Sequence, residues 1–364
     1  MLSKKILCAA ALAGGCFAAA PVQADSGPGG FFTSTAAGHA PIGVMGDHMH
    51  KSGEWMIGAR VMHMEMEGLR FGTDELTPEQ AVTSIPNVHF GKPGQPALLR
   101  VVPQEMQMDM LMVGLMYAPS DWLTLMASGR YVRKEMDALT FQGMMGTTRL
   151  GTFNMTTEGF GDTVVTGLVR LYEDAHTHVH LNAGLSLPTG SITESATMLT
   201  PMNMRMTMRA GYGMQLGSGT YDLLPGITYV GRTEDYSWGA QLGGTLHLGR
   251  NDEGYTLGDA ARLTAWVSRE WAPWISTSVR VAGEHVGQID GQDDQIVGPS
   301  PAANPLFSGG ERVELFAGVN LMAQSGALKG HRLAFEIGTP VYEDVNGLQM
   351  ERDLVATIGW QKSF

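Results

Sequence analysis

Cysteine is almost absent from this 364-residue chain, and its two copies lie near the start. Cys8 and Cys16 fall within a segment that has a basic start, an apolar run and the small-residue cleavage site Val22-Gln23-Ala24, as an export signal does. We therefore expect residues 1–24 to be a signal peptide. Lipoprotein processing at Cys16 is the alternative, although residues 13–15 do not match a Leu-led lipobox. The mature chain would contain no thiol and no disulfide.

Long apolar runs and basic residues are also scarce. No stretch of roughly 18 apolar residues follows Ala24, which excludes a bundle of transmembrane helices. Lys and Arg number 24 against 36 Asp and Glu, so the net charge is −12 and no basic stripe is present to bind nucleic acid. The 48 glycines and a hydrophobic content of 43% instead favour many strands and turns in one large domain.

Alternating hydrophobicity is the strongest pattern in the chain. In residues 104–117 and again in 53–66, aliphatic or aromatic side chains alternate with methionines. Because successive side chains of a strand point to opposite faces, each segment is predicted to be a strand with one face toward lipid and the other toward an enclosed interior. The predicted lining residues are Met56, Arg60, Met62, Met64, Met66, Met106, Met108, Met110, Met112 and Met116.

Similar alternation recurs along the chain, and the connections differ systematically in length. The alternating segments are 53–66, 104–117, 122–136, 160–172, 178–189, 212–230, 237–249, 259–271, 274–286, 311–323, 331–342 and 351–364. Long connections such as 67–103 contrast with short ones such as 119–121, as in outer-membrane barrels with short periplasmic turns and long extracellular loops. We predict an all-β, antiparallel, up-and-down transmembrane barrel of about twelve strands over residues 53–364. Residues 25–52 would form a periplasmic segment before it.

Charged residues on the later strands are predicted to face the interior. Arg280 with Glu284, and Arg332 with Glu336, lie on the faces opposite the apolar ones, which implies a wet or paired lining. The chain ends in an alternating segment with Phe364 last, as substrates of the bacterial outer-membrane assembly machinery usually end. We therefore expect a bacterial outer-membrane location, with lipid and that machinery as partners.

The methionines suggest one cargo. Thioether sulfur is a soft donor that prefers Cu(I), and a row of weak sulfur sites would let an ion pass. Methionines of the 190–211 connection, together with Met144 and Met145, would form an outer vestibule. A second set of candidate metal ligands, preceded by His39, lies in the segment before the first strand; it comprises Met45, Asp47, His48, Met49 and His50. Copper would be cargo, and no resident cofactor is implied.

Other functions fit the same residues. A methionine-rich lining also suits small hydrophobic or aromatic solutes, because methionine adapts to irregular apolar surfaces. His176, His178 and His180 alternate near a short turn, and two of them on one face are either metal ligands or solvated rim residues. No local motif pairs a nucleophile with a base, so we predict no enzyme, with an outer-membrane hydrolase as a lesser alternative. The remaining alternative is a non-transporting structural barrel whose lumen is plugged by residues 25–52.

Several motifs resemble a family of proteobacterial outer-membrane transporter-like proteins, the group named for the MetA pathway of phenol degradation. The segment Ala40 to His50 followed by Gly53-Glu54-Trp55-Met56 resembles the family's opening. Further similar stretches are Gly114 to Leu125, Gly159 to Thr163, Leu187 to Ser191 and Gln215 to Tyr229. The resemblance implies an outer-membrane barrel and, from the group's name, transport of aromatic compounds. It implies no catalytic residues.

Overall fold

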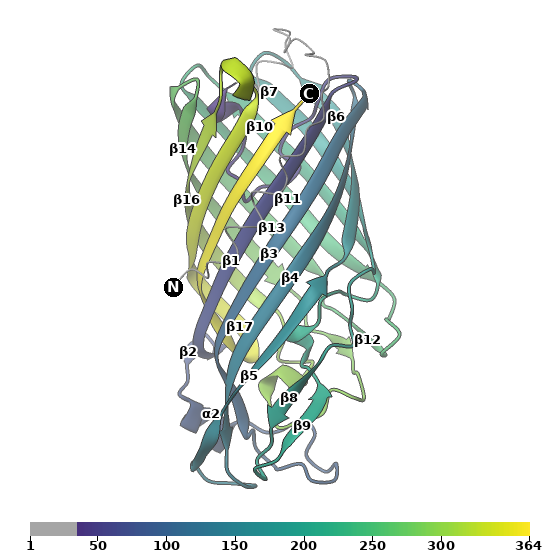
Figure 1. Ribbon diagram of the computed structural model, residues 1–364, viewed down its shortest axis with the longest axis vertical. Coiled ribbons are helices and arrows are strands. Elements are labelled where there is room, and N and C mark those ends of the chain that lie inside the picture. The colour runs from purple at the N-terminus through teal and green to yellow at the C-terminus, as the bar shows by residue number, and fades with distance from the viewer. Residues whose placement is uncertain (1–34) are drawn as a thin grey trace.

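The chain folds into a closed antiparallel β-barrel (Figure 1). The computed structural model describes residues 35–364, so the expected signal peptide, both cysteines and residues 25–34 lie outside the described residues. Among the described residues, no helix is long and apolar enough to cross a membrane. The barrel elements are β1 (Trp55–Gly72), β3 (Val101–Ser120), β4 (Leu123–Phe141), β6 (Thr163–Glu173), β7 (Thr177–Leu187), β10 (Tyr221–Arg232), β11 (Tyr236–Leu248), β13 (Ala260–Ala272), β14 (Ile275–Val286), β16 (Gly310–Met322) and β17 (His331–Ser363).

The 33-residue element β17 closes the barrel by pairing with both of its neighbours. Its first part pairs with β16 as far as Val345, and the remainder pairs with β1 as far as Ser363. Gly347, with a φ of 67°, lies at the turn between the two parts, where a residue with a Cβ would be strained. The eleven described barrel elements therefore cross the wall twelve times, which agrees with the sequence prediction.

Further elements gather at the end of the barrel opposite the carboxyl terminus, at the bottom of Figure 1. We call this the loop end and the other the turn end. The additional elements are β2 (Asp74–Glu75), α2 (Pro78–Ser84), β5 (Arg149–Phe160), β8 (Ser195–Leu199), β9 (Arg205–Arg209), β12 (Tyr255–Thr256), β15 (Asp290–Gly291) and the 3-10 helices η1 (Ala36–Gly38), η2 (Tyr212–Met214), η3 (Pro301–Ala303) and η4 (Gly326–Leu328). Two of these elements lie elsewhere, because η1 belongs to the segment before β1 and η4 to the short connection between β16 and β17.

Two boundaries differ from the sequence prediction. The sixth expected strand, 212–230, begins too early, because Tyr212–Met214 forms η2 and β10 starts only at Tyr221. The expected loop 137–159 contains β5, which pairs with residues 131–141 of β4, whereas β6 pairs with residues 123–128 of the same strand. β5 and β6 thus follow one another along a single edge of β4.

The two faces of the barrel wall have the predicted chemistry. Leu111, Val113 and Leu115 of β3 are exposed on the outside, whereas Met106 and Met116 of the same strand are buried. Trp55, Trp122, Trp271, Trp274 and Phe364 lie exposed near the turn end. Aromatic side chains at this level are typical anchors at a membrane–water interface, so the outer surface is suited to lipid.

Residues 35–52, here called the plug, lie inside the barrel. The plug starts and ends at the turn end, where the amide of Ala36 donates to the Pro273 carbonyl and the amide of Ser52 donates to Asp121. Most of the residues between are buried. The described part of the segment that was expected on the periplasmic side therefore occupies the interior instead. Apart from β1, which follows the plug directly, the strands that it contacts lie far away in the sequence.

Candidate functional site in the barrel interior

The predicted lining methionines form rows across neighbouring strands. β1 and β3 are adjacent, and their register places methionine directly opposite methionine four times: Met56 and Met116, Met62 and Met110, Met64 and Met108, and Met66 and Met106. The rows continue sideways, because Met116 faces Met126 of β4, and Met106 faces Met136, which in turn faces Met155 of β5. The sulfur-bearing side chains therefore lie side by side on the inner face.

These thioethers pack against apolar atoms. Near the plug, Met56, Met116 and Met49 form one cluster with Leu168. In mid-barrel, Met62, Met64, Met66 and Met108 pack against Ala282, Phe316 and Val355, which lie on β14, β16 and β17. Met112 lines two internal cavities, one of which also touches Arg60. Met110, opposite Met62, is half-buried. The packing shows that the sulfurs serve at least as core-filling groups.

An apolar cavity of about 380 Å³ lies at the loop end. The hairpin β8–β9 contributes most of its methionines, and the 142–148 and 296–303 loops contribute further lining residues. Its methionines are Met136, Met144, Met155, Met198, Met202, Met204, Met206 and Met208. The expected outer vestibule thus exists as one cavity, although Met145 is not among its lining residues and is instead exposed.

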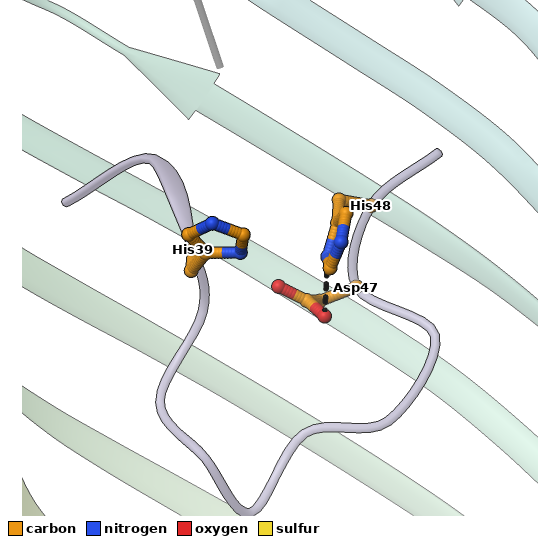
Figure 2. A group of neighbouring side chains, drawn as sticks. All are labelled: His39, Asp47 and His48. Atoms are coloured by element: carbon orange, nitrogen blue, oxygen red, sulfur yellow. Dashed lines mark hydrogen bonds and ion pairs between the residues drawn. The ribbon is translucent and has the colours of Figure 1, made fainter. Parts of the chain in front are cut away.

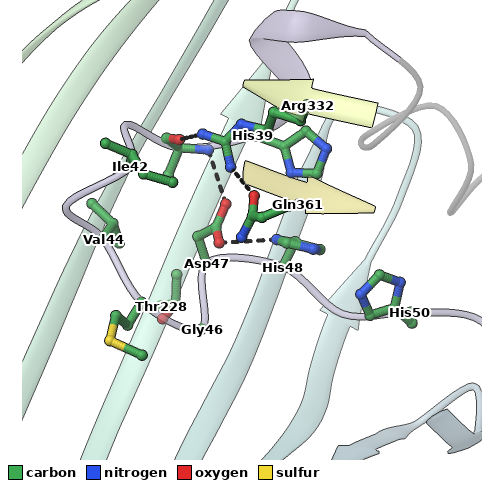
Figure 3. A network of polar contacts seen from close by, with 12 residues as sticks. His39, Ile42, Val44, Gly46, Asp47, His48, His50, Thr228, Arg332 and Gln361 are labelled. Carbon is green, nitrogen blue, oxygen red and sulfur yellow. Dashed lines mark hydrogen bonds and ion pairs between the residues drawn. The ribbon is translucent and has the colours of Figure 1, made fainter. Parts of the chain in front are cut away.

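Buried arginines hold the plug in place. Arg60 of β1 donates from Nη1 to the carbonyl oxygens of Ile42, at 2.5 Å, and Val44, at 3.2 Å. Arg332 of β17 donates to the carbonyl of Ala40. It also donates to the Gln361 side chain, as Figure 3 shows. Charged donors make stronger hydrogen bonds than neutral ones. Arg60, predicted as a lining residue, is therefore a plug anchor.

Further anchors come from β17 again and from three more strands. The amide of Gly43 donates to Oε2 of Glu336 at 2.9 Å, and Gln241 of β11 donates to the Met45 carbonyl at 2.9 Å. His180 of β7 lies 2.8 Å from the Gly46 carbonyl through Nε2, and His178 contacts its Nδ1 at 2.9 Å. Asn320 of β16 binds the carbonyl of His39 at 3.2 Å. His178 and His180 therefore belong to the plug contacts, whereas His176 is exposed at the turn.

The plug also carries a buried cluster of histidines around Asp47 (Figure 2). Nδ1 of His48 lies 2.9 Å from Oδ1 of Asp47, and Oδ2 of Asp47 accepts from the Ala40 amide at 2.9 Å. Burial holds the pKa of His39 well below its usual value, and the nearby Arg332 and His48 lower it further. Burial raises the pKa of Asp47, but the contact with His48, including its hydrogen bond, and the charge of Arg332 outweigh burial, so this pKa lies well below its usual value. His39 therefore stays neutral beside an ionised Asp47 at neutral pH.

The predicted metal ligands separate into two groups. Asp47, His48 and His39 lie together, with one potential ligand atom from each residue within 4.8 Å of the others. His50 stacks edge-on beside His48 at 5.0 Å between ring centroids, and its Nδ1 lies 3.4 Å from Glu54. Met49 packs instead into the methionine cluster near Leu168, and Met45 lines two internal cavities. Both methionines thus lie outside the histidine cluster.

Two cavities meet at the wall formed by β4, β6, β7 and β10. An internal cavity of about 240 Å³ lies beside Met45 and Met112, and an apolar cavity of about 710 Å³ includes the outward-facing Leu115, Leu185 and Leu246. Four residues line both: Met126, Thr166, Asn182 and Pro225. Pro225 has no amide hydrogen, and the pairing of β10 with β11 skips Leu224 and Pro225. The ladder between β10 and β11 is therefore interrupted at these two residues.

Comparison with known proteins supports the fold. No family model matches the chain, and no curated protein matches it. An outer-membrane channel from Pseudomonas putida F1 superposes with a TM-score of 0.55 and 11% identity, over 88% of this chain and 99% of that one. The transport unit of the autotransporter AIDA-I from Escherichia coli gives 0.45 at 10% identity, over 88% and 93%. The toluene transporter TbuX of Ralstonia pickettii gives 0.41 at 13%, over 93% and 94%. The first superposition confirms the predicted outer-membrane barrel fold.

Proposed function

We propose that the protein is a bacterial outer-membrane channel through which small apolar or aromatic molecules diffuse. The observation that carries this proposal is the apolar, methionine-lined cavity at the loop end. Its volume of about 380 Å³ lies in the range of small-molecule sites, roughly 300 to 1,000 Å³. Flexible thioethers suit binding of varied apolar shapes without tight affinity.

The interior offers such a solute a way out that avoids the plug. The plug and its buried ion pairs close the central path toward the turn end. The internal cavity, in contrast, touches Leu224 and Pro225 and shares four lining residues with the apolar cavity on the lipid side. The free energy of an apolar molecule is lower in hydrocarbon than in water. We therefore place its exit through the wall at Pro225, between β10 and β11.

The lateral exit is tested by a reversible cross-link. Residues 223 and 226 pair with 246 and 243, so Leu224 and Thr245 lie opposite one another. In the double variant Leu224→Cys, Thr245→Cys, a disulfide would close the wall, and uptake of labelled toluene into proteoliposomes should fall several-fold and recover on reduction. The matched control is Tyr229→Cys, Ala240→Cys, a paired position on the same two strands. Equal uptake by oxidised and reduced double variants would exclude this exit.

The apolar cavity is tested separately. Met198 and Met208 line this cavity and are half-buried, so glutamate there places charge in an apolar site. We expect Met198→Glu, Met208→Glu to slow toluene uptake, whereas leucine at both positions preserves it. Wild-type protein that gives no faster uptake than empty liposomes would refute the proposed function itself.

Passage of a soft metal ion is the second candidate function. The directly opposed methionine pairs of β1 and β3 favour it, because neighbouring sulfurs can share one Cu(I). Replacing Met62, Met64, Met108 and Met110 together with leucine should then abolish Cu(I) or Ag(I) binding and leave toluene uptake intact. Unchanged metal binding by this variant would exclude the candidate.

A further inference from the structure

Three side chains of the plug converge on one buried point. His39, Asp47 and His48 are each less than a tenth exposed, and the rings of the two histidines meet edge-on with centroids 4.7 Å apart. One nitrogen from each imidazole and one oxygen from the carboxylate lie within 4.8 Å of one another. Figure 2 shows His39 and His48 on either side of the Asp47 carboxylate.

Two nitrogens in this group lack protein partners. Nδ1 of His39 and Nε2 of His48 are buried, and neither has a hydrogen-bond partner among the described residues. A buried polar atom without a partner costs roughly 1 to 3 kcal/mol, so two within one small cluster call for an explanation. An ion bound at Nδ1 of His39 would accept its lone pair and satisfy this atom.

Asp47 and His48 already lie at the separation of two neighbouring metal ligands. Nδ1 of His48 and Oδ1 of Asp47 are 2.9 Å apart and share a proton, and an ion bound between them would take the place of that proton. Asp47 is itself fixed by the Ala40 amide, so the group is held in place before any ion arrives.

We propose that His39, Asp47 and His48 bind one divalent transition-metal ion, of the class of Zn²⁺, that fastens the plug. Imidazole nitrogen and carboxylate oxygen are donors for Zn²⁺ and its neighbours, whereas Cu(I) prefers sulfur and Ca²⁺ prefers oxygen alone. The ligands come from both sides of residues 40–46, the stretch that Arg60, Glu336 and Gln241 hold inside the barrel. The ion would close this stretch into a loop. It is a resident structural ion, distinct from any cargo.

Positive charge nearby sets the strength expected of the site. Arg332 donates to the carbonyl of Ala40, next to His39, and Figure 3 shows its guanidinium beside the cluster. This cation opposes a bound metal ion, while Asp47 supplies one compensating negative charge. Zn²⁺ affinity should therefore be moderate, and removing either imidazole should weaken it by at least about tenfold.

The test measures metal binding to the purified full-length barrel in detergent after treatment with a chelator. Zn²⁺ is titrated calorimetrically, and bound metal is counted by mass spectrometry after dialysis. Wild type should bind one Zn²⁺ per chain, and His39→Gln and His48→Gln should each lose at least about tenfold in affinity. His285→Gln is the matched control, because His285 lies exposed on β14, away from the plug.

Folding is checked independently of metal. Heat-modified migration on gels reports whether each variant keeps a closed barrel, so a variant that fails to fold is recognised. Co²⁺ absorption then tests the ligands directly, since its visible bands should appear in wild type and His285→Gln and disappear in the double variant His39→Gln, His48→Gln. Absence of stoichiometric Zn²⁺ in folded wild type, or equal affinity in the folded double variant, would overturn the proposal.

Discussion

Arg280 and Glu336 form a two-point ion pair inside the barrel. Nε of Arg280 lies 2.7 Å from Oε1 of Glu336, and Nη2 lies 3.0 Å from Oε2. The guanidinium reaches across β16 by lying over the ring of Phe316, 3.7 Å from its centroid. Because Oε2 also accepts from the amide of Gly43, the pair links the wall to the plug.

Removing the charge of Glu336 should therefore destabilise the whole barrel. Glu336→Gln leaves the Arg280 charge buried without an anionic partner, at a cost of about 3 to 5 kcal/mol. The urea concentration at which half of the protein has lost the folded band on unheated gels should fall accordingly. Glu311→Gln is the control, since Glu311 is exposed at the end of β16, and an equal shift in both variants would contradict this explanation.

Gly43 should be intolerant of any side chain. A Cβ at this position would lie 2.2 Å from Oε2 of Glu336 and 2.6 Å from Nη2 of Arg280. We expect Gly43→Ala to displace the middle of the plug and to raise single-channel current in planar bilayers. Gly129→Ala is the control, because a Cβ there meets nothing within 4 Å. Similar currents from the two variants would mean that the plug tolerates the displacement.

Asp162 should fasten the loop between β7 and β10. Its carboxylate lies at the junction of β5 and β6 and accepts from the amides of Gly190, at 2.9 Å, and Ser218, at 2.8 Å. In Asp162→Asn, one amide donor faces another donor, which costs about 1 to 3 kcal/mol. Hydrogen exchange in residues 188–220 should accelerate. Asp290→Asn, at an exposed loop position, should leave this exchange unchanged.

Arg100 should organise the loop that carries Met144. Its buried guanidinium donates to the carbonyls of Gln142, Gly143 and Gly146, at 2.7, 3.0 and 2.6 Å. Arg100→Met removes these charged hydrogen bonds, so we expect the loop to loosen by on the order of 3 kcal/mol. Faster exchange of residues 142–148 would show it. Arg250→Met, an exposed arginine elsewhere at the loop end, serves as the control.

Acid should loosen the loop around His89. Burial lowers the pKa of His89 below its usual 6.5, and its Nε2 lies 3.1 Å from the Ala303 carbonyl. The unfolded loop therefore takes up a proton at a higher pH than the docked loop, so docking weakens as pH falls below about 6.5. A spin label at Val88→Cys should gain mobility between about pH 7 and pH 5. Adding His89→Gln should abolish this pH dependence.

The sequence predicts the barrel wall well because the wall depends on local pattern. The period of two at Met56 to Met66 sets which side chains face inward, and connection lengths set which end carries the loops. β8 and β9 escaped prediction because they are short and lie within an expected loop. Their methionines nevertheless line the cavity that lies where the sequence predicted a vestibule.

The interior contacts could not be predicted in the same way. Glu284 lies on the same strand as Arg280, but the partner of Arg280 is Glu336, because a long side chain reaches across a neighbouring strand. The plug position depends on Arg60, Arg332 and His180, which come from three different strands. No pattern within residues 35–52 contains that information. His39 was set apart from the predicted ligands for the same reason, since only folding brings it to Asp47.

The pairing of β1 with the end of β17 also constrains biogenesis. The plug directly precedes β1 in the chain, and β1 finds its second neighbour only when residues 348–363 have been made. A nascent polypeptide truncated before Leu348 would keep an open seam from which residues 35–52 could escape. Sealing of the stopper inside the cylinder therefore waits for a segment about 300 residues further along the chain.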